Sequence, residues 1–369
     1  MKRFIQIHML TAYPPANLNR DDQGSPKTAK MGGYDRLRVS SQCLKRTWRT
    51  SEIFEHALAG HLGKRTKEMG LEIYNRLTEL GVSHKKALEW TKSIAGVYGK
   101  LKTHSKKDRD AVAELDEDKR LKKVLVEVEI EQLAFFDTLE QESIFSLINT
   151  IAERGEGPTK DELNLLRKPV SSADIALFGR MLADSPNYNI EAAYQVAHSI
   201  SVHPIAIEDD YFTAVDDLNT MKEDMGAAHI GETRFSAGLF YSYICINLEL
   251  LIENLNGHVD LAIKTVRALV EAAVKVAPEG KQNSFGSRAY ASYVLAEKGD
   301  QQPRTLSAAF LKPINHRDND DFLRDSIKAL LTQQKSFDAV YGACADGRYT
   351  LNILSKEGVL TELLDFVGK

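Results

Sequence analysis

The sequence predicts an α+β fold in which a split βαβ sheet carries an inserted helical lobe. Residues 4–10 alternate between apolar and polar side chains, which is typical of a strand. Residues from about 52 to 123 are highly charged and mostly helical in pattern. Two long strand-like segments, 192–203 and 234–248, enclose a polar, aspartate-rich excursion. We therefore expect a sheet that is interrupted once by helices and once by a protruding arm.

The first fifty residues predict two strands and a helix. The strand at 4–10 is followed by a long polar connection, 11–35, and a connection of this length inside a folded domain is usually functional. Residues 36–39 form a second, short strand. Ser40 or Ser41 then caps a helix, because serine hydroxyls accept hydrogen bonds from first-turn N–H groups.

The remaining elements follow from periodicity and capping signals. Residues 124–130 alternate as a strand, although the start of a helix is also consistent with them, and 131–154 have a helical pattern. Thr159–Glu162 is a capping box that predicts another helix. Further predicted elements are a helix at 260–277, a strand at 288–297, and two helical segments near 321–332 and 358–367.

Composition limits the possible functions. The chain has 369 residues, 43% hydrophobic and 27% charged, with a formal net charge of −4, so any anion-binding surface must be local. The three cysteines include no CxxC pair, which argues against a zinc module and for a reduced compartment. No signal peptide or membrane-length apolar run is apparent. We expect a cytoplasmic protein without a membrane partner.

One segment, RLRVSSQCLKRTWR at residues 36–49, concentrates positive charge and contains no acidic residue. On a helix beginning at Ser41, Lys45 and Arg49 share a face with Arg46 beside them, while Leu44 and Trp48 form an apolar row. Free N–H groups at the helix start, with serine and glutamine donors, favour an anion. A phosphate site and an ordinary surface helix are both consistent with this pattern.

Five sequence blocks, in order, resemble one known family. They are residues 4–49, 173–183, 211–218, 227–241 and 246–255, beginning with FIQIHMLTAYPPANLNRDD and including ALFGRM, YFTAVDDL and ETRFSAGLFY. The chain resembles the CasC family, a group of RAMP-superfamily proteins that form the repeated backbone of the type I-E CRISPR surveillance complex, Cascade. The resemblance weakens toward the C-terminus.

The resemblance implies a right-hand-shaped protein. Its palm, a modified RRM-like or ferredoxin-like fold, would comprise residues 1–58 and 185–369, with a β-hairpin thumb at about 202–235. A helical finger domain would comprise 59–184. Copies of such a subunit stack along the spacer of a CRISPR RNA, contact other Cascade subunits, and present the RNA for pairing with target DNA in antiviral defence. The family implies no enzymatic activity, cofactor or metal.

The resemblance also implies site residues by matching position. RNA-binding positions are Arg20, Lys27, Ser40, Gln42, Lys45, Arg46, Arg49, Met181, Ser201, Val202 and His229, with Met181 acting as an apolar wedge against a base. A weaker correspondence assigns target-DNA contacts to Lys160, Arg167 and Lys168.

Two other functions remain open. A metal-dependent, RNA-guided ribonuclease of type III-like character would use aspartates, for which Asp21–Asp22, Asp209–Asp210 and Asp216–Asp217 are candidates. A stand-alone RRM would bind single-stranded RNA through exposed aromatics, but FIQIHML has no such run. His8 is expected in the core, and His198 and His203 are expected on opposite faces of a strand, which disfavours a shared metal.

Overall fold

The computed structural model describes residues 2–103, 123–214, 229–315 and 321–369. The chain divides into two compact units, the first comprising Met1–Ala57, Tyr194–Glu249 and Ile263–Lys369 and the second Leu58–Ala193 and Leu250–Ala262. The predicted helical domain ended at residue 184, whereas 185–193 and 250–262 belong to the second unit. The α+β class is confirmed, with a large antiparallel sheet in the first unit.

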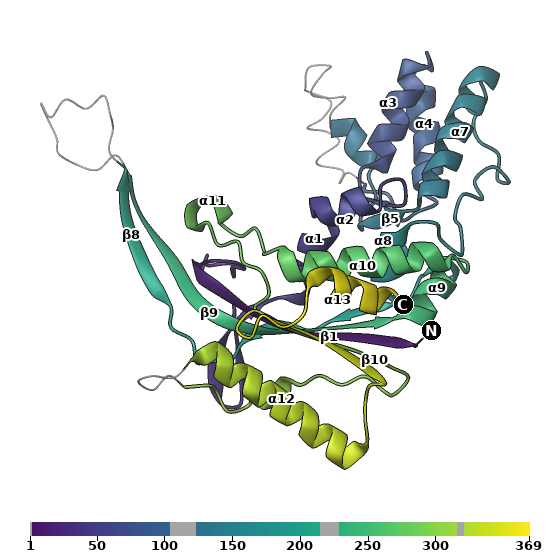
Figure 1. Ribbon diagram of the computed structural model, residues 1–369. Coiled ribbons are helices and arrows are strands. Elements are labelled where there is room, and N and C mark those ends of the chain that lie inside the picture. Colours follow the sequence, from purple (N-terminus) through teal and green to yellow (C-terminus); the bar gives the residue numbers. More distant parts are fainter. Residues whose placement is uncertain (1, 104–122, 215–228, 316–320) are drawn as a thin grey trace, which may run out of the picture. The chain divides into compact units, whose positions relative to one another are not determined.

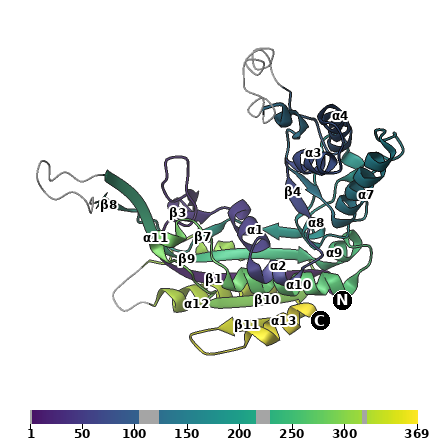
Figure 2. The same cartoon turned by 90° about the horizontal axis from the view of Figure 1, so that it is seen from above.

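The sheet of the first unit has nine strands in the order β11-β10-β1-β9-β7-β3-β2, and β6 and β8 each pair with β9. All pairings are antiparallel. The strands are β1 (Phe4–Ala16), β2 (Thr28–Met31), β3 (Tyr34–Val39), β6 (Tyr194–Val196), β7 (Ser199–Ser201), β8 (Glu208–Ala214), β9 (His229–Asn247), β10 (Tyr293–Gly299) and β11 (Gly347–Asn352). The long strand β9 therefore connects the centre of the sheet with the β8–β9 hairpin (Figures 1 and 2).

Helices cover both faces of this sheet. Helix α1 (Ser41–Arg49) lies on the same side as α13 (Leu360–Gly368), and α12 (Phe322–Tyr341) covers the other side (Figure 1). Under α12, Leu10, Tyr241 and Phe310 belong to one buried apolar cluster. The remaining helical elements are α2 (Glu52–Ala57), α11 (Gln282–Phe285) and η3 (Ser307–Phe310), while α9 (Leu248–Asn254) and α10 (Val259–Lys275) continue into the second unit.

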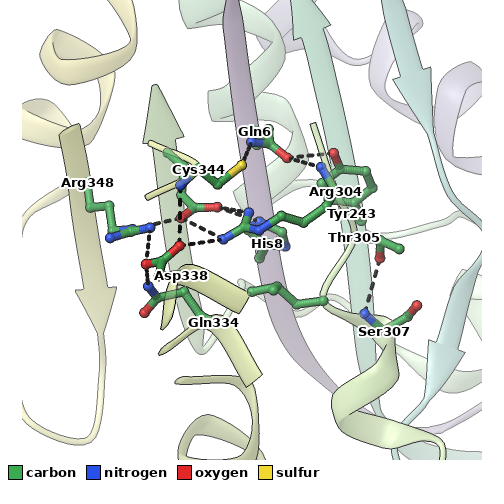
Figure 3. A network of polar contacts seen from close by, with 12 residues as sticks. Gln6, His8, Tyr243, Arg304, Thr305, Ser307, Gln334, Asp338, Cys344 and Arg348 are labelled. Carbon is green, nitrogen blue, oxygen red and sulfur yellow. Dashed lines mark hydrogen bonds and ion pairs between the residues drawn. The ribbon is translucent and has the colours of Figure 1, made fainter. Parts of the chain in front are cut away.

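A polar network around the buried residues His8 and Glu297 joins β1, β10, β11 and α12 (Figure 3). Glu297 is fully buried and accepts hydrogen bonds from Arg304 at 2.5 Å and Arg348 at 2.7 Å. Arg348 also reaches Asp338 on α12 at 2.6 Å. His8 is fully buried, as expected, with Nε2 3.2 Å from Glu297 and Nδ1 2.8 Å from the hydroxyl of Tyr241. Charge pairing thus fixes the C-terminal elements on the sheet.

The second unit is mainly helical. Its elements are β4 (Lys64–Thr66), α3 (Met69–Glu79), α4 (His84–Ala95), η1 (Leu125–Val128), β5 (Ala134–Phe136), α7 (Thr138–Arg154), α8 (Ala173–Phe178) and η2 (Pro186–Tyr188). Ile73, Trp90 and Ile148 belong to its apolar core. Asp137 caps α7 in a complete capping box with Glu140.

Several predicted elements were wrong in detail. Residues 125–128 form a 3₁₀ turn rather than part of a strand at 124–130. Thr159 and Glu162 exchange the capping-box hydrogen bonds, but only a turn follows. The connection 11–35 contains the end of β1 and all of β2, and β11 was not predicted. In the described part of the chain, every helix is too short or too polar to cross a membrane.

Candidate nucleic-acid interface

Helix α1 starts at Ser41 because Ser40 caps it. The backbone of Ser40 is extended, with φ −68° and ψ 145°, and its Oγ accepts a hydrogen bond from the N–H of Cys43 at 3.3 Å. The Ser40 N–H donates to Oδ1 of Asn19 at 2.9 Å, and the Ser41 N–H donates to Nδ1 of His198, also at 2.9 Å. The helix entrance is therefore held by the preceding loop and by the connection between β6 and β7.

These bonds correct one expectation about the helix entrance. The N–H groups of Ser41 and Cys43 were expected to be available to an anion, but both have partners within the protein. Gln42 is exposed, and its Oε1 accepts a hydrogen bond from the Ser41 hydroxyl at 3.4 Å. Anion binding at this helix must therefore come mainly from side chains.

Three cations surround the entrance, namely Lys27, Arg38 and Lys45, which we call the basic cluster. None of them forms an ion pair with another residue of the described chain. The Nζ of Lys45 lies 5.8 Å from the ring centroid of Tyr194, and burial lowers the pKa of Lys45. Burial and then the charges of Arg38 and Lys27 lower the pKa of His198. Positive charge is thus concentrated here, and no carboxylate of the described residues pairs with it.

Two neighbouring cations, Arg36 and Lys30, add no unpaired charge to the basic cluster. Arg36 is fully buried, where Nη1 donates to the carbonyl of Ser201 at 3.0 Å and Nη2 to that of Phe310 at 2.8 Å. Lys30 lies 3.7 Å from the carboxylate of Asp35. Arg36 therefore connects strands of the sheet, and the exposed cationic surface is smaller than the sequence suggested.

Arg20 and Arg46 lie together on a different part of the surface. Both line a cavity of about 610 Å³ that is also lined by Asp21, Asp22 and Glu279. Asp21 orders the loop, because its Oδ1 accepts hydrogen bonds from the N–H groups of residues 23 and 25 at 3.0 and 2.8 Å. This cavity has mixed charge, so its two arginines are less free to attract phosphate than the basic cluster.

The loop that carries Arg20 and Lys27 is fixed to the base of the β8–β9 hairpin. The amide of Asn17 donates to the carbonyl of Arg234 at 2.7 Å, and the Arg234 guanidinium donates to the hydroxyl of Ser25 at 3.1 Å. Lys281 donates to the hydroxyl of Thr233 on β9. The loop and the hairpin base are consequently parts of one hydrogen-bonded structure.

Two predicted RNA contacts at the hairpin base need correction. Ser201 and Val202 are both 0% exposed. The Ser201 hydroxyl accepts from the N–H of Leu37 at 3.0 Å and donates to the carbonyl of His203 at 2.9 Å. Both residues therefore support the strand rather than present side chains to a ligand. His229 begins β9, and its side chain lies outside the described part of the structure.

In the second unit, Met181 is 71% exposed. It follows Arg180, a buried residue whose Nη1 lies 2.9 and 2.8 Å from the two carboxylate oxygens of Glu140. Burial raises the pKa of Glu140, although the charge of Arg180 opposes this rise. An exposed methionine on such a fixed support is suitable as an apolar wedge, and that role stays a prediction.

The candidate DNA contacts differ in availability. Lys160 and Lys168 are exposed. The guanidinium of Arg167 donates to the carbonyls of Asn164 and Leu166 at 2.9 and 3.2 Å. Arg167 is thus partly used inside its own loop, and Lys160 and Lys168 are the more available of the three.

The alternative function, a metal-dependent ribonuclease, requires a metal site. Among the described residues, no group of three or more histidine, cysteine or acidic side chains is positioned to hold an ion. Asp209 accepts a hydrogen bond from Arg234 at 2.9 Å. Asp216 and Asp217 lie outside the described residues, so the structure does not bear on them. Asp22 lines the mixed cavity beside Arg20.

One known protein family matches nearly the whole chain. Residues 5–362 match the CT1975-like proteins, Cas_CT1975. The chain belongs to this Cas family. Its resemblance to the CRISPR backbone subunits, inferred from the sequence blocks, is thereby confirmed. No curated protein matches the sequence.

Solved structures agree with the family. A chain of a structure titled "CRISPR RNA-guided surveillance complex, pre-nicking" superposes with a TM-score of 0.82 at 26% identity, covering 99% of both chains. A chain of another, titled "CRISPR RNA-guided surveillance complex", superposes with a TM-score of 0.72 at 22% identity and 99% coverage of both. The fold of this Cas protein is therefore that of subunits found in such complexes.

Sequence reasoning missed two residues at the interface of this Cas protein. His198 was considered only as a metal ligand, and Arg38 was part of the basic segment 36–49 but was not assigned to the site. The contact between Ser41 and His198 joins residues that are 157 positions apart, so no local pattern reveals it. The absence of acidic residues from 36–49 was the one available signal for Arg38.

Proposed function

We propose that the chain is a CRISPR RNA-binding backbone subunit of a type I-E Cascade complex, and that the basic cluster holds the sugar-phosphate backbone of the guide. The observation that carries this proposal is the position of Lys27, Arg38 and Lys45 around a capped helix entrance, without ion-pair partners among the described residues. Uncompensated cations of this kind attract phosphate and release counterions when they bind it.

The chemistry of the cluster suits a guide of any sequence. Ammonium and guanidinium groups contact phosphate and leave the Watson–Crick edges of the bases free. The Ser40 hydroxyl accepts the hydrogen bond that caps α1, whereas Gln42 is exposed and supplies an uncharged donor beside the cluster. We infer that binding is independent of sequence and that the bases remain available to target DNA.

The roles that we propose for the domains and for single residues are those that the family resemblance implies. We propose that the first unit acts as the RRM-like palm, the second as the finger domain, and the antiparallel β8–β9 hairpin as the thumb. Several copies would stack along the RNA with other Cascade subunits in the cytoplasm, and Met181 would displace a base at intervals. The subunit would have no catalytic activity of its own, and Lys160 and Lys168 would contribute to holding DNA.

The test replaces two cations of the cluster. Lys27→Ala combined with Lys45→Ala should weaken binding of full-length protein to RNAs of unrelated sequence by similar factors. The slope of log affinity against log salt concentration should become shallower by about one to two units. Fluorescence anisotropy at several salt concentrations measures both quantities.

A matched control makes the same charge change elsewhere. Lys328 and Lys335 are exposed on α12, which covers the opposite side of the sheet from α1. Lys328→Ala with Lys335→Ala should leave affinity and slope unchanged. Equal losses in the two double variants, or a loss confined to one RNA sequence, would contradict backbone binding by the cluster.

A further inference from the structure

His198 is a polar residue at the interface that the proposed function does not use. It lies where the edge of the sheet is interrupted, after β6 ends at Val196 and before β7 begins at Ser199. Its side chain is exposed, yet its Nδ1 accepts a 2.9 Å hydrogen bond from the backbone N–H of Ser41. The histidine is thus attached directly to the first residue of α1.

This hydrogen bond determines the tautomer of His198. A backbone N–H can only donate, so Nδ1 must be unprotonated, and the proton of the neutral imidazole is on Nε2. Within the described residues, Nε2 has no hydrogen-bond partner. An oriented N–H donor is therefore available at the surface.

The groups around His198 keep it neutral. Burial lowers its pKa, and the charges of Arg38 on β3 and Lys27 before β2 lower it further. Lys30 of β2 lines the same apolar cavity as His198, and Ser41 of α1 contacts the ring directly. Protonation of Nδ1 would also place two donors against each other at Ser41. The imidazole consequently acts as an uncharged donor among cations.

We propose that His198 is a further RNA-binding residue, whose Nε2–H donates to a phosphodiester oxygen of the guide. This inference rests on the proposed function. The neighbouring cations favour an anionic acceptor at this position, and Lys45 lies one helical turn beyond Ser41 on the same face of α1. A phosphate that is held by Lys45 or Lys27 would then lie beside the imidazole.

The proposal explains why a histidine suits this position. The residue must accept a hydrogen bond from Ser41 on one side and donate one outward on the other. Lysine and arginine cannot accept, and a carboxylate cannot donate when ionised. A neutral imidazole does both on a rigid ring, with its two nitrogens in fixed relative positions.

Two conservative variants separate a binding role from a structural one. His198→Asn retains an acceptor near the position of Nδ1 and has no atom near Nε2. His198→Gln places an amide near Nε2 and loses the acceptor for Ser41. We expect His198→Asn to keep the melting temperature of the wild type and to bind RNA about tenfold more weakly, since one hydrogen bond to a charged group is lost. His198→Gln should melt at a lower temperature and retain more of the affinity.

These measurements distinguish a failure of the His198 inference from a failure of the proposed function. If His198→Asn binds RNA like the wild type, or loses affinity only in proportion to a lowered melting temperature, the inference is overturned. If the Lys27→Ala, Lys45→Ala variant also binds RNA normally, the proposed function fails as well. Imidazole ¹⁵N chemical shifts give an independent readout, which should show the Nε2–H tautomer at pH 7 and a change at Nε2 when RNA binds. An Nδ1–H tautomer would contradict the proposal.

Discussion

Arg36 and Arg38 show how two cations of one strand acquire different roles. They lie two positions apart on β3 and hence point to the same face. The guanidinium of Arg36 is enclosed and bonded to the carbonyls of Ser201 and Phe310. Arg38 lies further along, is half-buried, and contributes its charge to the environment of His198. The same residue type is structural at one position and available to a ligand at the next.

This difference predicts opposite effects of two alanine substitutions. Arg36→Ala leaves two buried carbonyls without donors and should lower the free energy of unfolding by about 2–4 kcal/mol. Arg38→Ala should change stability by less than about 0.5 kcal/mol and weaken RNA binding. Urea unfolding and RNA anisotropy measure the two effects. A loss of stability in Arg38→Ala larger than that in Arg36→Ala would show that the roles are reversed.

Histidines with a lowered pKa make stability depend on pH. Burial lowers the pKa of His8 from its ordinary 6.5, although its hydrogen bond to Glu297 opposes this, and burial also lowers the pKa values of His198 and His203. Below pH 6.5 the unfolded chain binds protons that the folded chain does not, so stability must fall as the pH falls. The fully buried His8 should account for most of this loss, at most about 1.4 kcal/mol per pH unit, and the exposed His198 for the least.

Urea unfolding at pH 7.5, 6.5 and 5.5 tests this dependence. His8→Gln should be less stable than the wild type at pH 7.5 but should lose less stability on acidification. The pKa of Glu297 is lowered by its bonds to His8 and Arg304, although burial alone would raise it. The stabilisation that the Glu297 carboxylate provides is therefore lost only below pH 4.5, the ordinary pKa of a glutamate, and this lies outside the tested pH range. Stability that is constant from pH 7.5 to 5.5 would contradict the assignment.

At the scale of elements, the loop 17–27 depends on close backbone packing. A Cβ on Gly280 would lie 2.2 Å from the carbonyl oxygen of Leu18 and 2.7 Å from that of Asn17. Only glycine permits this approach, which holds the loop bearing Arg20 and Lys27 against the segment that precedes α11. The position of Lys27 therefore depends on a residue that carries no charge.

Gly280→Ala should displace this loop. We expect a loss of about 1–3 kcal/mol in stability and weaker RNA binding, although no cation has been removed. Gly99→Ala is a suitable control, since a Cβ there meets nothing nearer than a side-chain atom of Ile130 at 3.8 Å. Wild-type RNA affinity in Gly280→Ala would show that the loop does not contribute to binding.

Local elements of this fold could be predicted from sequence, and contacts between distant segments could not. Helix α1, its Ser40 cap and the buried pair Leu44 and Trp48 follow from a few adjacent residues. The bond between Ser41 and His198 needs the sheet to be assembled first. The burial of Ser201, which the resemblance placed among the RNA-binding positions, has the same cause, because the side chain and carbonyl of Ser201 are used by β3.

The two errors in the second unit have specific causes. The alternation at 124–130 indicated a strand, but Val128 packs its backbone directly over Gly70, where a Cβ would lie 2.0 Å from the Val128 oxygen. The capping box at Thr159 indicated a helix. The Glu162 carboxylate instead accepts hydrogen bonds from Nη1 and Nη2 of Arg154, each at 2.9 Å. The capping box therefore stabilises a turn that follows α7. In both cases tertiary contacts override a local pattern.

At the scale of the whole molecule, the proposal accounts for positive charge on an acidic protein. The net charge is −4, yet the cations at the α1 entrance form no ion pair within the described chain. A subunit that repeats along RNA forms a non-closing assembly, whose length must be limited by something other than its own contacts. A guide of defined length would provide that limit, provided that each copy holds the backbone and ignores the bases.

A structure of the protein assembled on RNA would test this claim most directly, through the distance between Nζ of Lys45 and the nearest phosphate oxygen. The account predicts a charge-assisted contact of about 2.7–2.9 Å in each copy, whatever the local base. If Lys45 pointed into solvent, or contacted base edges that differed from copy to copy, the claim that this cluster holds the guide backbone would be wrong.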